Sequence, residues 1–327
     1  MNILWSGARS KLLRATHVAM AGLVLLLTLQ EVQAQLSYTK GQHIEPAYEG
    51  WEQNEDGSFS FVFGYMNINW AEEIDVPVGE LNSFSPGLAD RGQPTHFLPR
   101  RNRFIFKVPV PADWGDKELV WTLSANGVTK KAYASLKPDY LVDNIVIASE
   151  NGSLGAGTSS PESRANVPPT VVIGDGKHKA EYTVAVGKKL MLRTQVKDDG
   201  IPKPIAALVA LQRAAGSKRL ADGTPESALR PPSRVTVGKT VGLHLSWFVY
   251  RGDGQVTFDP QQVKIWEDTR ASANSPWGPS WTPPPIPKDG WYEVNVTFAE
   301  PGTYVLGARA DDGGLHTDKY VTVRVKR

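Results

Sequence analysis

Apolar and polar residues alternate with a period of two in several short segments of the first half of the chain. In the segment 58–65, every second position is aromatic, and Asp56-Gly57 before it is a hairpin-type turn pair. Because successive side chains on a strand point to opposite faces, this pattern predicts a strand with one core face. Pro109 predicts that its own segment is an edge strand or a strand end. The further segments with this pattern are 104–110, 119–123 and 128–136.

The second half of the chain repeats the alternation, most strongly in the segment 241–249. There Leu243, Leu245 and Trp247 share one face, which predicts that Trp247 fills the space between two sheets. His244 falls on the opposite face, which we expect to meet solvent. The other segments predicted as strands are 182–186, 190–196, 292–298, 303–310 and 320–325.

The two sets of strands are separated by residues 148–169, which are rich in Gly, Ser, Thr and Pro and show no periodicity. Such a segment is typical of a linker. The sequence therefore predicts an all-β protein of two antiparallel β-sandwich domains, at 36–147 and 170–327. Two long excursions, at about 201–234 and 266–290, interrupt the second domain.

The N-terminus has the order of a secretory signal peptide. A basic stretch is followed by the apolar run 18–29, and Val32 and Ala34 stand at the −3 and −1 positions of a cleavage site. The alternative is an uncleaved anchor, but twelve residues make only about 18 Å of helix against a hydrocarbon core of roughly 30 Å. We expect residues 1–34 to be removed. The mature protein is then exported, periplasmic or extracellular, with no stable membrane span.

Six runs of the second domain, at 183–190, 196–202, 243–247, 297–306, 310–313 and 320–323, carry a resemblance to a known family. With these runs, the domain resembles the PKD and related immunoglobulin-like domains of bacterial exported proteins. The resemblance covers about 160 residues, and it implies a β-sandwich. Where many such domains read Trp-Asp-Phe-Gly-Asp-Gly, this chain reads Trp-Phe-Val-Tyr-Arg-Gly-Asp-Gly from position 247. The first domain resembles the N-terminal region of uncharacterised exported bacterial proteins, which implies no activity. The resemblance of the first domain rests on the runs 63–67 and 104–123.

Composition narrows the possible functions. The 327 residues include no Cys, which excludes disulfides and thiol chemistry. The net charge of +2 equals the excess of basic residues within residues 1–34, so the mature chain is neutral overall. A neutral chain makes nucleic acid a poor partner. No His-Glu-x-x-His run, Gly-x-Ser-x-Gly elbow or complete phosphate-binding loop occurs, so we expect no cofactor and no catalytic site.

The excursion 266–290 is the best candidate for a binding surface. It is dominated by Trp and Pro, and a loop of this length is either functional or disordered. Exposed Trp rings can stack on sugars or anchor a protein partner. The alternative is that the rings fold back as a lid over the domain. The candidate ligand-binding residues are Trp266, Trp277, Trp281 and Trp291.

Two Asp-Asp-Gly runs could place carboxylates at one end of the second sandwich. Calcium takes six to eight oxygen ligands, several of them from carboxylates. However, Asp followed by Gly at a strand end is also ordinary turn chemistry, and we favour the turn. The weak candidates for metal ligands are Asp198, Asp199, Asp311 and Asp312.

Taken together, these patterns indicate a non-catalytic exported protein with a role in binding, adhesion or spacing. Its partner would be a protein or polysaccharide of the bacterial envelope. The alternative function is that of an accessory subunit or hydrolase acting on polysaccharide. A cleft lined by Trp with two facing carboxylates would favour that enzyme.

We predict that export removes the segment up to Ala34, because the basic stretch, short apolar run and small residues at −3 and −1 occur in the required order. N-terminal sequencing of the exported protein should begin near Gln35. Recovery of an intact Met1 or Asn2 would contradict this prediction.

Overall fold

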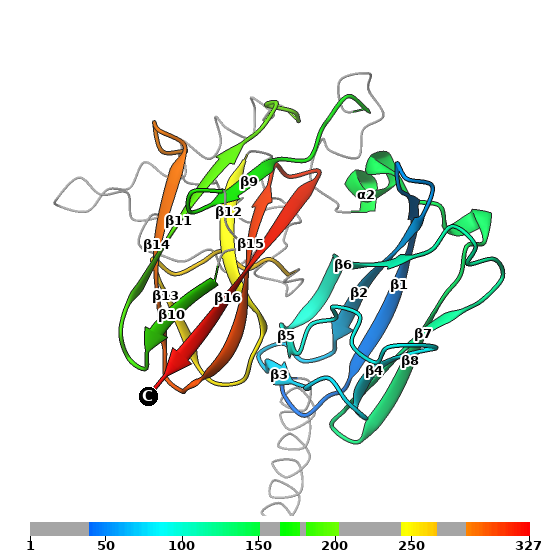
Figure 1. Ribbon diagram of the computed structural model, residues 1–327, viewed down its shortest axis with the longest axis horizontal. Coiled ribbons are helices and arrows are strands. Elements are labelled where there is room, and N and C mark those ends of the chain that lie inside the picture. The colour runs from blue at the N-terminus through cyan, green and yellow to red at the C-terminus, as the bar shows by residue number, and fades with distance from the viewer. Residues whose placement is uncertain (1–38, 151–163, 177–180, 203–242, 267–285) are drawn as a thin grey trace, which may run out of the picture.

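The computed structural model describes residues 39–150, 164–176, 181–202, 243–266 and 286–327. The predicted signal peptide, most of the predicted linker and the larger part of both excursions lie outside these ranges. Figure 1 shows two β-rich domains side by side: the first runs from blue to green, and the second begins with the green strands β9 to β11 and continues through yellow to red.

The first domain is a sandwich of two three-stranded antiparallel sheets. One has the order β1-β2-β6, and the other has the order β4-β7-β8. A two-stranded ribbon of β3 and β5 lies beside them, and the domain ends in a 3₁₀ turn, η1, and a short helix, α2. The bounds are β1 Ile44–Gln53, β2 Phe59–Asn67, β3 Ile74–Asp75, β4 Asn82–Ser85, β5 His96–Phe97, β6 Arg100–Val110, β7 Leu119–Ala125, β8 Val128–Ala134, η1 Pro138–Tyr140 and α2 Asn144–Glu150.

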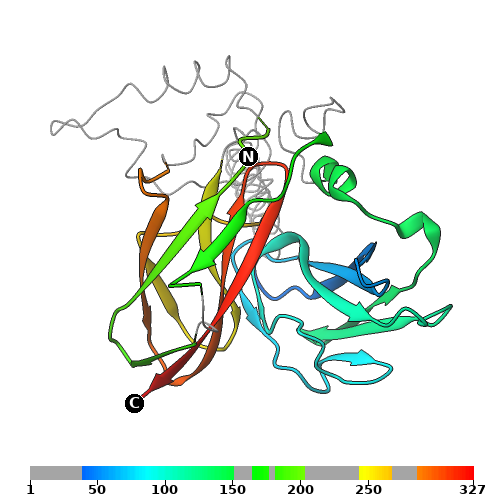
Figure 2. The ribbon, with the colours of Figure 1, turned by 45° about the horizontal axis from the view of Figure 1, so that its top comes forward.

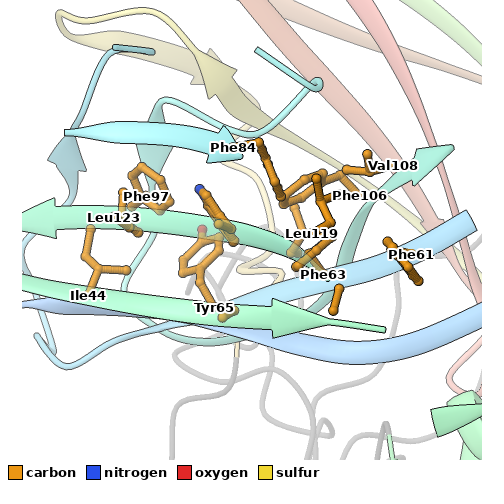
Figure 3. Packing of buried hydrophobic residues seen from close by; sticks show 14 of the residues in the cluster. Ile44, Phe61, Phe63, Tyr65, Phe84, Phe97, Phe106, Val108, Leu119 and Leu123 are labelled. Carbon is orange, nitrogen blue, oxygen red and sulfur yellow. The ribbon is translucent and has the colours of Figure 1, made fainter. Parts of the chain in front are cut away.

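Aromatic rings fill the space between the two sheets of the first domain. Phe63 of β2 stacks on Phe106 at 5.4 Å and meets the edge of Trp121 at 5.9 Å between ring centroids. The Trp121 indole N–H donates to Oδ1 of buried Asn82 at 2.9 Å, so the largest ring of this core leaves no polar group unpaired. Figure 3 shows several of these rings pointing toward one another from facing strands.

The second domain is an immunoglobulin-like sandwich of two four-stranded sheets. We call β10-β16-β15-β12 the docking sheet and β13-β14-β11-β9 the distal sheet. Among the described strands only β10 pairs in parallel, with β16. The bounds are β9 Thr170–Ile173, β10 Glu181–Ala185, β11 Leu190–Lys197, β12 His244–Arg251, β13 Val256–Asp259, β14 Trp291–Phe298, β15 Gly302–Asp311 and β16 His316–Lys326.

The core of the second domain is built around Trp247 and Tyr304. Trp247 is 2% exposed between the two sheets, as the alternation predicts. The Tyr304 hydroxyl donates to the carbonyl of Glu300 at 3.1 Å, and its ring lies against Gly252, which has a φ of +119°. A Cβ at position 252 would overlap that ring, so the turn after β12 requires glycine both for its φ and for its space.

The predicted fold class is confirmed: both domains are β-sandwiches, and each segment predicted as a strand coincides with an observed one. The expectation for Pro109 is also confirmed, because β6 stands at the edge of its sheet. The alternation does not predict β1, β3, β4, β5, β9, β13, η1 or α2. The domain boundaries stay a prediction.

The outer face of the docking sheet packs against the first domain over β12, the adjoining part of β15 and the start of β16, while the outward side chains of β10 and of the second half of β16 are partly or fully exposed. Its cross-strand register places three rows of side chains on this face: His244–Asp311–His316, Ser246–Arg309–Asp318 and Phe248–Gly307–Tyr320. The expectation that His244 meets solvent is therefore wrong, since it is only 3% exposed. The physical reason is that β12 is covered on both faces, on one by its own core and on the other by a neighbouring domain.

A buried ion pair lies at the centre of this face. Arg309 donates through Nε and Nη2 to the two carboxylate oxygens of Asp318, at 2.8 and 2.7 Å. Both side chains are less than a tenth exposed. The guanidinium carbon also lies 5.8 Å from the Phe248 ring centroid. Satisfying the charges in this bidentate way offsets the cost of removing them from water.

We predict that Asp318→Asn lowers the free energy of unfolding by about 3–5 kcal/mol, because it leaves Arg309 buried and unpaired. The double variant Arg309→Met with Asp318→Leu removes both charges and should lose much less. Denaturant unfolding of the full chain measures both. If Asp318→Asn is as stable as the parent, the Arg309–Asp318 pair does not stabilise the buried face of the docking sheet.

Candidate functional site

Backbone and side-chain hydrogen bonds join the two domains. The N–H of Thr95, next to β5, donates to the carbonyl of Tyr250 at 3.1 Å, and the Tyr250 hydroxyl donates to the carbonyl of Gly92 at 2.5 Å. Arg251 donates to both carboxylate oxygens of Asp90, at 3.0 and 2.7 Å, and to the carbonyl of Gln93 at 2.8 Å. We call these contacts, together with the buried face of the docking sheet, the interdomain seam.

Apolar packing makes the seam continuous with the first domain's core. Phe248 and Tyr250 of β12 belong to the same buried cluster as the aromatic rings of the first domain. The Phe248 ring lies across Gly307, where a Cβ would overlap it. Tyr320 closes the row, with its ring 4.6 Å from that of Tyr250 and its hydroxyl donating to the carbonyl of Ile105 at 3.2 Å.

A second apolar contact joins the domains beside α2. Leu315, in the turn between β15 and β16, is 2% exposed and packs with Val62, Ile147 and other apolar residues of the first domain. His316 follows it, and its Nε2 donates to the carbonyl of Phe104 at 3.3 Å. Burial and the nearby Arg309 lower the pKa of His316 to about 4, so the ring stays neutral within the seam at neutral pH.

Next to the seam, His96 is held between two carboxylates. Its Nδ1 lies 2.7 Å from Asp75 Oδ1 and its Nε2 lies 3.0 Å from Glu73 Oε2. Burial opposes the charged form of His96, but the hydrogen bonds to Asp75 and Glu73 outweigh it and raise its pKa to about 9. With both ring nitrogens engaged, His96 is a fixed cation and not a free acid or base.

The four candidate tryptophans fall in different places. Trp277 and Trp281 lie outside the described residues. Trp266 is 6% exposed, and the Lys264 ammonium lies 4.4 Å from its ring centroid. Trp291 is partly exposed at the first residue of β14. The interpretation of these residues as a binding surface stays a prediction.

Trp291 stands on the outer face of the distal sheet. Its cross-strand neighbour is Gln195 of β11, and Gln195 pairs in turn with Val172 of β9. Arg193, two residues before Gln195, holds its guanidinium 5.0 Å from the Trp291 ring centroid and pairs with Glu293 at 3.0 Å. In Figures 1 and 2, β11 and β14 lie on the side of the second domain away from the first domain.

The four aspartates cap turns. Asp198 accepts from the N–H of Gly200 at 2.8 Å, and Asp311 accepts from that of Gly313 at 2.6 Å. Asp199 accepts from the N–H of Ile201 within its own turn, and its other oxygen accepts from the N–H of Val167 in the segment before β9. Asp312 accepts from Gly314 and Leu315 at 2.6 and 2.7 Å, which fixes the turn that carries Leu315 into the seam. Burial raises the pKa of Asp312 to about 7.

Within the described ranges, no group of three or more His, Cys, Asp or Glu side chains is placed to hold a metal ion. Over the same part of the chain, no helix is long and apolar enough to span a bilayer. The residues that reasoning from sequence missed are those of the seam, above all Phe248, Tyr250 and Arg251.

Comparison with known proteins supplies no family. No family model matches the chain, and no curated protein matches it. Among solved structures, it is similar to domains 4 and 5 of the S-layer protein SbsC, with 8% identity and a TM-score of 0.23, covering 65% of this chain and 66% of that one. The chain thus spans just under two thirds of that fragment.

Two further solved structures show a similar degree of likeness. The fibronectin(III)-like modules of Clostridium thermocellum CbhA give 10% identity and a TM-score of 0.20, covering 86% of this chain and 94% of that one. The N-terminal eight Ig domains of Down Syndrome Cell Adhesion Molecule give 8% identity and a TM-score of 0.22, covering 86% of this chain and 26% of that one. Likeness at this level says nothing about function, and the sandwich fold rests on this chain's own sheets.

We predict a pH-dependent contribution of His96 to stability. Because its pKa is raised from about 6.5 in the unfolded chain to about 9 in the folded one, its stabilisation is complete below pH 6.5 and is lost as pH rises through 9. The stability difference between the parent and His96→Gln should therefore shrink from pH 6.5 to 9.5 in denaturant unfolding. Glu73→Gln, which removes one carboxylate partner, should reduce the same pH-dependent part. A difference that grows with pH would contradict this assignment.

Proposed function

We propose that this chain is a non-catalytic exported protein whose two β-sandwiches act as one rigid unit, with a role in binding, adhesion or spacing in the bacterial envelope or outside the cell. The observation that carries the proposal is the interdomain seam. Domains that move independently usually share only a small, polar interface. Here, by contrast, Phe248 and Tyr250 of the second domain belong to the hydrophobic core of the first.

The seam has the properties of a permanent contact. It combines aromatic packing, a bidentate Arg251–Asp90 pair across the domains and the backbone hydrogen bond from Thr95 to Tyr250. Each of these fixes orientation as well as proximity, because its geometry is directional. A unit of fixed shape can hold a ligand-binding face at a set distance and angle from whatever the other domain contacts.

A non-catalytic role is supported by what the described polar groups already do. The carboxylates of the two Asp-Asp-Gly runs accept backbone N–H groups in turns. His96 is locked between Asp75 and Glu73, and His316 is neutral within the seam. Export is supported by the order of basic, apolar and small residues in the segment 1–34.

The alternative, an accessory subunit or hydrolase acting on polysaccharide, is favoured by one observation: the partly exposed Trp291 on the distal sheet. A release of reducing ends from polysaccharide by the purified protein would favour the hydrolase. Binding without release is expected from a non-catalytic protein.

The rigid-unit proposal is tested by cutting the chain between its domains. A specific protease site inserted between positions 151 and 163 allows cleavage of the mature protein, and we predict that the two halves then co-elute in size-exclusion chromatography. Phe248→Ala with Tyr250→Ala should separate them, since truncating a buried aromatic ring costs about 3–5 kcal/mol.

The matched control is Tyr133→Ala, which removes a tyrosine ring that is 55% exposed on β8. It should leave co-elution unchanged. Halves of the parent protein that separate on cleavage would contradict the rigid unit, as would a seam variant whose halves stay together as firmly as those of the parent.

A further inference from the structure

The second sandwich has two outer faces, and only one of them meets the first domain. The docking sheet is covered at the seam, whereas the distal sheet presents exposed side chains from three adjacent strands. Met191 is 53% exposed and Val172 is 37% exposed on this face. Trp291 completes a set of apolar groups set among polar ones.

The register arranges these side chains in rows across the sheet. One row is Val172–Gln195–Trp291, the next is Arg193–Glu293, and the third is Met191–Asn295–Asp259. Rows on one face of a strand are about 7 Å apart, and neighbouring strands are about 4.8 Å apart. The result is a broad face with an indole at one end, a thioether at the other and amide groups beside each.

Four of the charged side chains on this face form two ion pairs, and exposed Lys197 at the end of β11 adds one further positive charge. Arg193 pairs with Glu293 at 3.0 Å, and Asp259 pairs with Lys189 at 3.4 Å. The face therefore carries a single unbalanced positive charge, at its end, which is too little to form a field that would select a charged polymer. The Arg193 guanidinium beside the ring also restricts the orientation of the Trp291 indole before any ligand arrives.

This combination fits the chemistry of a neutral sugar chain. A sugar ring has an apolar C–H face that packs on an indole, and its rim carries hydroxyl groups that both donate and accept hydrogen bonds. The side-chain amides of Gln195 and Asn295 can both donate and accept hydrogen bonds. Gln195 lies directly beside Trp291, and Asn295 lies directly beside Met191. A protein partner would instead require a larger continuous apolar centre than this face offers.

We propose that the outer face of the distal sheet, centred on Trp291, binds a neutral polysaccharide. The inference rests on the proposed binding role and supplies the class of its ligand.

The test uses the mature full-length protein and three polymers: insoluble cellulose and chitin, which are neutral or nearly so, and alginate, which is anionic. Sedimentation with each polymer measures affinity. The parent should bind at least one of the first two and should not bind alginate, and Trp291→Ala should weaken that binding at least tenfold.

Trp70→Ala is the matched control, because Trp70 is also a partly exposed indole beside a guanidinium, with Arg100 at 3.9 Å from its ring centroid, but it lies in the first domain. It should bind within twofold of the parent. Met191→Glu places a charge on the same face at an exposed position and should also weaken binding, whether or not Trp291→Ala folds.

The assignment is overturned if the parent binds neither cellulose nor chitin, if it binds alginate equally well, or if Met191→Glu and folded Trp291→Ala bind as the parent does. Failure here is distinguishable from failure of the rigid unit. If the halves co-elute after cleavage but the protein does not bind polysaccharide, only the assignment of the ligand class is contradicted. If the halves separate but Trp291-dependent binding persists, only the rigid-unit proposal is contradicted.

Discussion

The burial of the outer face of β12, β15 and β16 against the first domain is the constraint on which the rest of the structure depends. A sheet in a two-layer sandwich ordinarily has one dry and one wet face. Here β12, with the neighbouring part of β15 and the start of β16, is buried on both faces, so this part of the docking sheet is a middle layer between its own core and that of the neighbour. Polar groups on the second face must then find partners within the protein, and Arg309 with Asp318, His316 with Phe104 and Tyr320 with Ile105 do so.

The seam also accounts for which surfaces remain available. The edge of β12 would offer unpaired backbone groups to other chains, but the Thr95 N–H pairs with the Tyr250 carbonyl there. The distal sheet is left as the outward face of the second domain. The binding role and the sugar-binding face that we propose are therefore linked, because docking on one side determines the orientation in which the other side is presented.

Period-two alternation predicts the strands well because it reports a local property, the contact of one strand face with a core. Trp247 and Tyr304 follow from the same logic, and so do the turns at the Asp-Asp-Gly runs, since Asp and Gly act within a few residues. The alternation does not predict β1, because a bulge between Tyr48 and Gly50 interrupts its period of two.

The seam could not be read in this way, because its partner lies more than 150 positions away in the chain. A signal was nevertheless present, because Phe248 and Tyr250 place two aromatic side chains on the face of the strand opposite Leu245 and Trp247. The sequence places Trp291 just after the 266–290 excursion. Its neighbours Gln195 and Arg193 depend on cross-strand register, which no local pattern specifies.

Gly307 has a consequence for how such a protein can arise or be rearranged. The glycine leaves a flat hollow on β15 that the Phe248 ring fills, and Tyr320 borders it on the next strand. Separated from the first domain, this aromatic patch and the adjoining strand edge would face water and invite self-association. The second sandwich is thus unsuited to domain shuffling on its own. Gene rearrangements that preserve its fold should also include the first domain.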